Sequence, residues 1–307
     1  MSINAWERIS APTMRPDGTI LQAFGEDSTK KTKLIFTPPE NVRYADIKDK
    51  PTQAECEKHL ETICEAVSDF PFLKKHSLSA WLAGLFTCVA RTAIEGPTPL
   101  FVVSGEHGAG KSLLVRLASI IAYGEDVGVM GMAADDGEMR KRITTALHSF
   151  ERMAVFDNVW SMPHGDALAS VLTAETWVDR VHGASSSVRL PARTVWWMTA
   201  QPNLSLSADL SRRALHIQLG GLESPDAYEE RQRFVHPNLR AWALRQRAQL
   251  VPSVLTILRG FVVADKPVKS RVWGSYEEWS SLIPGAIQWA GLPDPTLVRF
   301  GSKSSGV

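Results

Sequence analysis

The residues of this sequence best suited to chemistry stand in one short glycine-rich stretch. They follow the pattern GxxxxGK[ST], and with the next residue they are Gly105, Glu106, His107, Gly108, Ala109, Gly110, Lys111, Ser112 and Leu113. Glycines allow successive backbone N–H groups to turn inward around a phosphate, and the start of a following helix adds partial positive charge. A lysine at this position reaches the outer phosphates of a nucleotide, and the next hydroxyl is a ligand for Mg²⁺. We therefore expect a phosphate-binding loop (P-loop) that holds ATP and Mg²⁺.

A magnesium site of this kind needs a carboxylate on a neighbouring strand. Residues 153–156 are apolar and Asp157 follows them, 46 positions after Lys111. We expect Asp157 to hold Mg²⁺ together with Ser112. The next residue is Asn158, so no second acid stands there to activate the attacking water. Three alternatives stay open: Asn158 orients the water, Glu106 or Glu175 acts as the base, or hydrolysis is slow or absent.

Two further polar groups follow later apolar runs. Gln201 and Asn203 come just after the run 195–199, and ligands of open α/β sheets lie past the carboxyl ends of strands. One of them is expected to contact the γ-phosphate or its attacking water, the alternative being an ordinary turn. Arg212 and Arg213 precede the last run. One of this pair is expected to reach a neighbouring subunit's nucleotide as an arginine finger, and the other to be an ion-pair partner.

The elements that must position these residues follow from the apolar pattern. Five apolar, β-type runs alternate with helical stretches, which predicts an α/β fold with a mostly parallel sheet covered by helices; the runs are 100–104, 127–132, 152–157, 194–199 and 215–219. We expect this core at residues 97–222. Residues 1–96 predict an extended arm and two helices, and residues 223–307 an all-helical subdomain with segments near 238–247, 250–263 and 277–289.

Composition limits the class of protein. Of 307 residues, 44% are hydrophobic and 22% charged, which excludes collagen-like, coiled-coil and disordered chains. Lys plus Arg (34) against Asp plus Glu (33) leaves a net charge of +1, so any basic surface must be local. The three cysteines lie at no zinc-ligand spacing, the first residues show no basic stretch followed by an apolar segment, and no run of about 18 apolar residues occurs. We expect a cytoplasmic protein with no membrane contact.

Together, the P-loop, the acid-ended run, the polar turn and the arginine pair resemble the AAA+ ATPases, in particular the superfamily-three helicases of viruses and plasmids. Residues 199–203 and 209–213 look like the sensor-1 and arginine-finger block of prophage and mobile-element primase–helicase proteins. Matching stretches run from about residue 10 to 292; they are 11–18, 69–72, 156–159, 236–239 and 274–279. Asp157-Asn158 is a familiar variant there, whereas the family's adjacent Asn pair is replaced by Gln201-Pro202-Asn203.

The resemblance implies a P-loop NTPase (AAA+-like) fold and an oligomeric ATPase, a hexameric ring, that acts on DNA in the replication of a phage-like element. A helicase or primase-associated helicase fits best, with this chain as the ATPase part alone or a stand-alone relative and a primase as a candidate partner. It also implies a β-hairpin just before sensor 1 that contacts single-stranded or forked DNA. Residues 177–190 have two β-prone arms around a Gly/Ser turn, with Arg180, His182 and Arg189 available to phosphate. An ordinary surface hairpin is the alternative.

Two rival functions stay open. The first is a regulatory, defence or packaging ATPase that switches conformation without unwinding DNA, and the second is a monomeric P-loop kinase. Other basic clusters are expected to be solvated faces, subunit contacts or DNA-facing surface; they are Arg140, Lys141 and Arg142 with Arg152, and the tail residues Arg231, Arg233, Arg240, Arg245 and Arg247.

Overall fold

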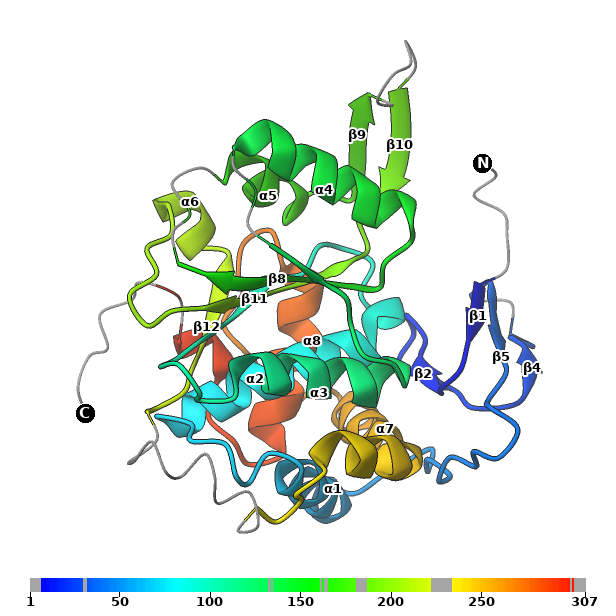
Figure 1. The fold of residues 1–307 in the computed structure, drawn as a ribbon. Helices are drawn as coiled ribbons and strands as arrows, with labels where there is room; N and C mark the ends of the chain where they lie inside the picture. Colours follow the sequence, from blue (N-terminus) through cyan, green and yellow to red (C-terminus); the bar gives the residue numbers. More distant parts are fainter. Residues whose placement is uncertain are drawn as a thin grey trace.

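The predicted apolar runs form one five-stranded parallel sheet in the computed structural model (Figure 1). The structure describes residues 7–29, 32–131, 133, 135–160, 162, 165–180, 187–221, 234–298 and 300. The strands lie in the order β12-β6-β11-β8-β7; their bounds are β6 (Leu100–Ser104), β7 (Val129–Met130), β8 (Met153–Val159), β11 (Val195–Ala200) and β12 (Ala214–Gln218). This is the predicted α/β, P-loop NTPase-like sheet, although the second run pairs only at β7.

The strand order corrects one expectation about the site. The strand of Asp157, β8, is not adjacent to β6, from which the P-loop emerges, because β11 lies between them. All three strands run parallel, so their carboxyl ends still meet at one edge of the sheet. Residues at the end of β11 therefore lie between the P-loop and the acid.

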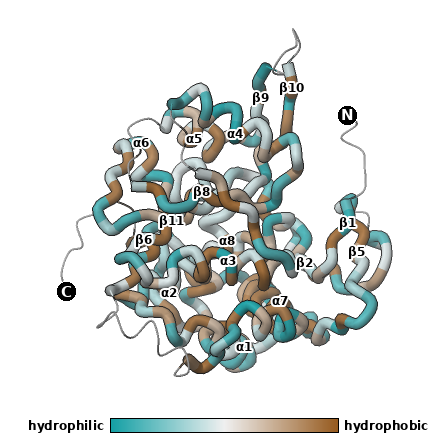
Figure 2. Tube along the Cα trace, in the orientation of Figure 1, coloured by the Kyte–Doolittle hydropathy of each residue, from teal (hydrophilic) through white to brown (hydrophobic). Residues whose placement is uncertain are grey.

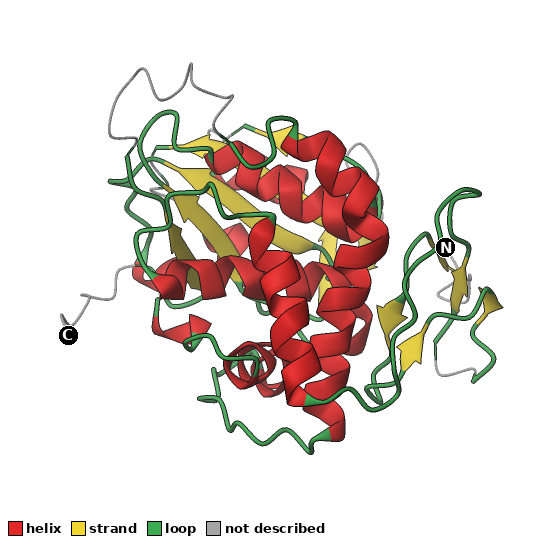
Figure 3. Cartoon of the chain, turned by 90° about the horizontal axis from the view of Figure 1, so that it is seen from below, coloured by secondary structure: helices red, strands yellow, loops and turns green. Residues whose placement is uncertain are grey.

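Helices cover both faces of the sheet. They are α1 (Gln53–Glu65), α2 (Lys75–Val89), α3 (Lys111–Tyr123), α4 (Asp136–His148), α5 (Asp166–Val171), α6 (Ala208–Ser211), α7 (Leu239–Val263) and α8 (Glu277–Trp289), with short 3-10 turns η1 (Arg91–Ala93) and η4 (Pro295–Leu297). Figure 3 shows the helical layer packed along the sheet, and Figure 2 shows hydrophobic residues both in β8 and along the helices. No described helix is long and apolar enough to span a membrane.

The side chains of β6 point alternately into the two hydrophobic clusters of the core, one on each face of the sheet. Phe101 and Val103 belong to the larger cluster, which includes residues of α1, α2, α3, α7 and α8. Leu100 and Val102 face the other cluster, which includes residues of α4 and α5. Because β6 is buried on both faces, the P-loop at its end starts from a fixed point.

The C-terminal helical region differs from the expectation. The segments predicted near 238–247 and 250–263 form one helix, α7, with Pro252 inside it. Proline removes the hydrogen bond to the carbonyl four residues earlier and usually breaks a helix. Here that carbonyl, on Ala248, accepts a hydrogen bond from the N–H of Ala45 at 3.1 Å. A donor from the N-terminal arm therefore replaces the lost helical bond.

Arg247 on α7 is buried, not exposed as expected for the tail arginines. Its guanidinium donates to the carbonyls of Ile121 and Ala122 at 3.0 Å each and also bonds the Tyr44 hydroxyl. Ile121 and Ala122 lie in the last turn of α3, where a cation satisfies free carbonyls. Arg247 thus fixes the far end of the helix whose first residue is Lys111.

The N-terminal arm is partly extended, as expected, and contains short strands beside the main body (Figure 1). They are β1 (Glu7–Ile9), β2 (Thr13–Met14), β3 (Ile20–Leu21), β4 (Gly25–Glu26) and β5 (Leu34–Phe36). Buried Asp27 accepts hydrogen bonds from Arg15, Thr29 and Thr32. Burial by itself raises the pKa of Asp27, but these hydrogen bonds outweigh it and hold that pKa well below the usual range.

Candidate nucleotide-binding site

The P-loop connects β6 directly to α3. Gly108 and Gly110 take φ angles of 88° and 85°, in the left-handed region that favours glycine. A Cβ added at Gly110 would also lie 3.0 Å from the ring of Phe70. Lys111 and Ser112 then begin α3, where the first N–H groups of a helix have no intrahelical partner. The loop therefore presents backbone donors and a helix N-terminus at the carboxyl edge of the sheet.

Lys111 is held inside the loop. Its Nζ donates to the carbonyls of Gly105 at 2.7 Å and Glu106 at 2.8 Å. Burial lowers the pKa of Lys111 below its usual value, and the carboxylates of Glu106 and Asp157 offset this only in part.

Ser112 and Asp157 meet across the sheet edge. Ser112 Oγ donates to Asp157 Oδ1 at 2.9 Å, and Thr199 Oγ1 donates to the same oxygen at 2.6 Å. A carboxylate beside a hydroxyl is the hard oxygen donor set that suits Mg²⁺. Ser112 and Asp157 therefore fit the metal that the P-loop pattern implies.

A β-bulge shapes the end of β8. Phe156 pairs with Met198 and Val159 with Ala200, so Asp157 and Asn158 together oppose the single residue Thr199. Asn158 takes φ 55°, a conformation that asparagine tolerates better than most residues. Its N–H donates to Thr199 Oγ1 at 2.7 Å, which fixes the bulged backbone. Such bulges redirect side chains and are frequent next to active sites.

The predicted polar turn only partly joins this site. Gln201 Nε2 donates to Asn158 Oδ1 at 2.9 Å, which places two amides beside Asp157. Asn203 is exposed two residues further along the loop. Thr199 bonds both Asp157 and Asn158, and the sequence reasoning missed it. The one signal in the sequence that could have indicated Thr199 is its hydroxyl, which stands near the end of the strand that precedes Gln201.

The arginine pair and Glu175 lie at the opposite edge of the sheet. Arg213 precedes Ala214, which pairs with Leu100 at the start of β6, whereas the P-loop follows Ser104 at its end. Four strand residues separate these edges by about 13 Å. The backbone carbonyl of Glu175 accepts a hydrogen bond from the N–H of Ala192, just before β11 begins, so Glu175 also lies away from the P-loop. This arrangement does not favour Glu175 as the base.

Both arginines contact one acid of their own chain. Arg212 Nε donates to Asp209 Oδ1 at 2.8 Å, and Arg213 forms an ion pair with the other Asp209 oxygen. The Arg212 side chain is 66% exposed and that of Arg213 only 15%. Arg212 is therefore the better placed of the two to contact another molecule.

The predicted hairpin is present as β9 (Thr176–Arg180) and β10 (Ser187–Pro191), and it projects from the body beyond α4 (Figure 1). Arg189 pairs with Val178 and Ser187 with Arg180, so both arginines share one face, and that face is exposed. The residues between the strands, His182 among them, lie outside the described residues.

The opposite face of the hairpin is anchored on α4. Trp177 Nε1 donates to Thr144 Oγ1 at 2.9 Å, and Arg140 lies 4.6 Å from the centroid of the Trp177 ring. Arg140 also pairs with Asp179 at 2.9 Å. Arg140 is therefore an anchor of the hairpin, and Arg180 and Arg189 stay on its outer side.

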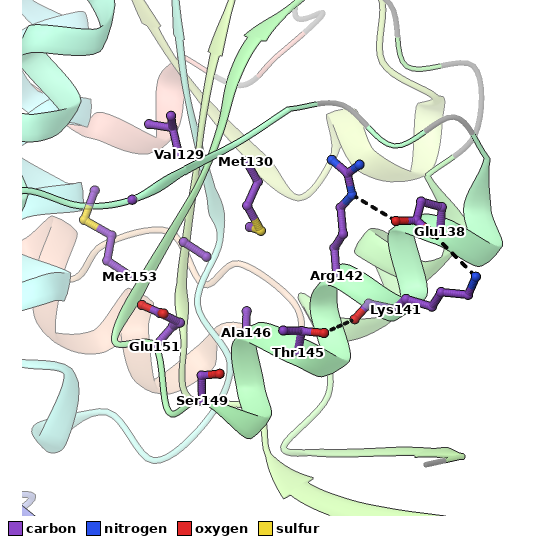
Figure 4. A pocket seen from close by; sticks show the side chains of 12 residues that line it. Val129, Met130, Glu138, Lys141, Arg142, Thr145, Ala146, Ser149, Glu151 and Met153 are labelled. Carbon is purple, nitrogen blue, oxygen red and sulfur yellow. Dashed lines mark hydrogen bonds and ion pairs between the residues drawn. The ribbon is translucent and has the colours of Figure 1, made fainter. Parts of the chain in front are cut away.

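A cavity of about 300 Å³ lies elsewhere, between β7 and α4 (Figure 4). Its basic residues are paired, because Glu138 contacts Lys141 at 3.5 Å and Arg142 at 3.4 Å. The lining includes no residue of the P-loop, and β8 contributes only its first two residues. This cavity is therefore distinct from the candidate nucleotide site.

Comparison with known proteins gives distant structural similarity only. No protein-family model matches this chain, and no curated protein matches it. Among solved structures, the A form apo structure of the NrS-1 C terminal region is 16% identical, with a TM-score of 0.39 over 72% of this chain and 49% of that one. A second NrS-1 structure, residues 305–718, is 14% identical, with a TM-score of 0.40 over 72% and 48%.

The structure of JCV Helicase is 12% identical, with a TM-score of 0.36 over 78% of this chain and 66% of that one. This chain spans about half the length of the two NrS-1 chains that it matches. Similarity at this level is too distant to assign a function.

Proposed function

We propose that this chain is a Mg²⁺-dependent ATPase. The single observation that carries the proposal is the hydrogen bond of 2.9 Å from Ser112 to Asp157, which joins a P-loop hydroxyl to the acid of a separate strand. Lys111 lies in the same loop, where its amine donates to the carbonyls of Gly105 and Glu106. The N–H donors of the P-loop, the Lys111 amine and the oxygens of Ser112 and Asp157 thus lie at one edge of the sheet. Nucleotide hydrolysis requires groups of these three kinds.

Each residue has a physical role in this proposal. The N–H groups of the loop and of the start of α3 bind the phosphates, and Lys111 moves from its loop carbonyls to the β- and γ-phosphates. Ser112 and Asp157 hold Mg²⁺, which when bound offsets negative charge on the phosphates. Asn158 and Gln201 supply amide groups beside Asp157, suited to orient water or contact the γ-phosphate. They accept no proton at neutral pH, which predicts modest intrinsic turnover.

We further propose that the ATPase is oligomeric and acts on DNA, as a helicase or primase-associated helicase of a phage-like element. Arg212 is exposed, and the length of β6, about 13 Å, separates it from its own P-loop. This position suits action on the nucleotide of a neighbouring copy. Arg180 and Arg189 share the exposed face of a hairpin anchored on α4, which suits contact with a phosphate backbone. A hexameric ring would bring these hairpins together around single-stranded or forked DNA.

A second candidate is a regulatory ATPase that switches conformation and moves no DNA. Two observations favour it: Asn158 stands where a second acid would activate water, and Asp209 of the same chain holds both arginines. A module of this kind binds nucleotide tightly and turns it over slowly.

The test is ATPase rate with no DNA, single-stranded DNA and duplex DNA, with the mass of the protein measured under the same conditions. The proposal expects assembly with ATP and a rate that DNA raises. Assembly without DNA stimulation would favour the regulatory candidate, and a lasting monomer would favour a kinase. Absence of ATP binding by folded protein would overturn the nucleotide site itself.

A further inference from the structure

The hydroxyl of Thr199 connects the two residues that end β8. Thr199 is 1% exposed and lies on β11, between the strand of the P-loop and the strand of the acid. It donates to Asp157 Oδ1 at 2.6 Å and accepts from the N–H of Asn158 at 2.7 Å. A threonine hydroxyl has one proton, so donation to Asp157 uses the only proton it has. The orientation of the hydroxyl is therefore determined by its two neighbours.

The same hydroxyl accounts for the bulge in β8. A bulge leaves one extra residue without its regular partner on the next strand. The N–H of Asn158 would be such a group, and Thr199 accepts its hydrogen bond. Side chains alternate between the faces of a regular strand, so loss of the bulge would change the direction of Asp157 relative to Ser112. It would also separate Asn158 from Gln201, whose side chains are 2.9 Å apart.

We propose that Thr199 is a positioning residue for the nucleotide site, which sets the direction of the Asp157 carboxylate and keeps the β8 bulge that joins Asn158 to Gln201. This inference rests on the proposed function, because it gives Asp157 a role in holding Mg²⁺. Thr199 itself touches neither phosphate nor metal in this role. Loss of an outer hydrogen bond to a metal ligand typically costs roughly 10- to 100-fold in metal affinity or activity.

The test compares Thr199→Val, which keeps the branched shape and removes the hydroxyl, with Thr199→Ser, which keeps the hydroxyl. Thr194→Val is the matched control, because Thr194 is a buried threonine just before β11 that bonds the Glu151 carbonyl at the other edge of the sheet. Thermal stabilisation by ATP is measured across Mg²⁺ concentrations and in EDTA. Exchange of the Asn158 amide is measured without any ligand.

For Thr199→Val we expect the Mg²⁺ concentration needed for half of the ATP stabilisation to rise about tenfold or more, while stabilisation by ATP in EDTA stays within about twofold. The Asn158 amide should exchange about tenfold faster or more. Thr199→Ser and Thr194→Val should match the unaltered protein in both measurements.

Two results would overturn the inference: a folded Thr199→Val protein with unaltered Mg²⁺ dependence and Asn158 exchange, or a folded Thr199→Ser protein that loses both. The serine variant decides the question if the valine variant does not fold. If the unaltered protein shows no stabilisation by ATP, the proposed function fails, and the ligand-free exchange measurement still decides whether Thr199 holds the bulge.

Discussion

Ser112 Oγ donates a hydrogen bond to Asp157 Oδ1 at 2.9 Å, although β11 separates the strands that lead to these two residues. The P-loop extends beyond the end of β6, and the bulge turns Asp157 at the end of β8. The two residues therefore meet above the end of β11, next to Thr199. This contact is the geometric basis of the proposed magnesium site.

Asp157→Asn keeps the shape of the side chain and removes its charge. We expect Mg²⁺-dependent ATP hydrolysis to fall about 100-fold or more, because a neutral amide is a poor ligand for a hard cation. ATP binding in EDTA should stay within about twofold. Steady-state hydrolysis and calorimetry with and without Mg²⁺ measure the two effects. Equal Mg²⁺ dependence in both proteins would exclude Asp157 as a ligand.

Lys111→Ala removes the amine that the P-loop carbonyls now hold. We expect ATP affinity to weaken by about 2 to 4 kcal/mol, or roughly 30- to 1000-fold, because a charged partner of the phosphates is lost. Lys58→Ala, an exposed lysine on α1, is the matched control and should bind ATP normally. Titration calorimetry measures both, and unchanged affinity of the Lys111 variant would contradict the proposed phosphate site.

Arg212→Ala tests the arginine pair. We expect ATP binding to be unchanged, but hydrolysis by the assembled protein to fall about 1000-fold, as for loss of an arginine finger. Arg213→Ala removes a largely buried ion-pair partner of Asp209, so its main expected effect is lower thermal stability. Hydrolysis rate against protein concentration distinguishes these outcomes. Normal hydrolysis by both assembled variants would show that neither arginine completes a neighbouring site.

The outer face of the hairpin is tested by the double change Arg180→Ala with Arg189→Ala. We expect DNA affinity to fall for every sequence, with a shallower dependence on salt, because in the proposed role both arginines contact phosphates. Lys141→Ala, which removes a lysine paired with Glu138 on α4, is the control. If the double variant keeps the DNA affinity and the salt dependence of the unaltered protein, this face of the hairpin does not contact DNA.

His216 predicts a loss of stability in mild acid. Its Nε2 lies 2.6 Å from Ser104 Oγ at the end of β6, and burial lowers the pKa of His216 from 6.5 to about 4. Below pH 6.5 the unfolded chain therefore takes up a proton that the folded chain excludes, so stability falls as pH decreases toward 4. At about pH 5 the excluded proton lowers the free energy of unfolding by roughly 2 kcal/mol relative to neutral pH.

Denaturant unfolding at about pH 7.5 and about pH 5, with His216→Gln beside the unaltered protein, measures this effect. The variant should lose less free energy of unfolding between the two pH values. Equal losses in the two proteins would show that His216 titrates normally in the folded state.

The amino-acid pattern predicted the parallel sheet because each of its strands is a short apolar run next to a helical stretch. The family resemblance predicted the hairpin at residues 177–190, and the two β-prone arms around small turn residues agree with that position. The pattern divided α7 into two segments, whereas the structure has one helix that continues through Pro252, with the Ala45 N–H at the carbonyl that proline leaves free. Local pattern contains no information about a donor about 200 positions away.

Thr199 could not be assigned from its own neighbourhood in the sequence. Its contacts depend on the register between β8 and β11, where two residues of one strand oppose one residue of the other. Side-chain period specifies which face of a strand is buried, but it does not specify where an extra residue is inserted. The apolar run therefore predicted Asp157 as the candidate acid, and the pairing of the strands places Thr199, the residue proposed to orient it, beside that acid.

The P-loop and the arginine pair occupy opposite edges of the sheet, and this separation restricts the symmetry of any assembly that uses both. A two-fold dimer uses both only if the P-loop and the arginine pair lie on one self-complementary surface, so that each copy's arginine meets the other copy's P-loop. A head-to-tail contact between different surfaces repeats instead, and a closed circle results only if the rotation between successive copies returns to the first. In an open chain of copies, one terminal P-loop would have no arginine from a neighbour, so complete activity of every copy requires closure.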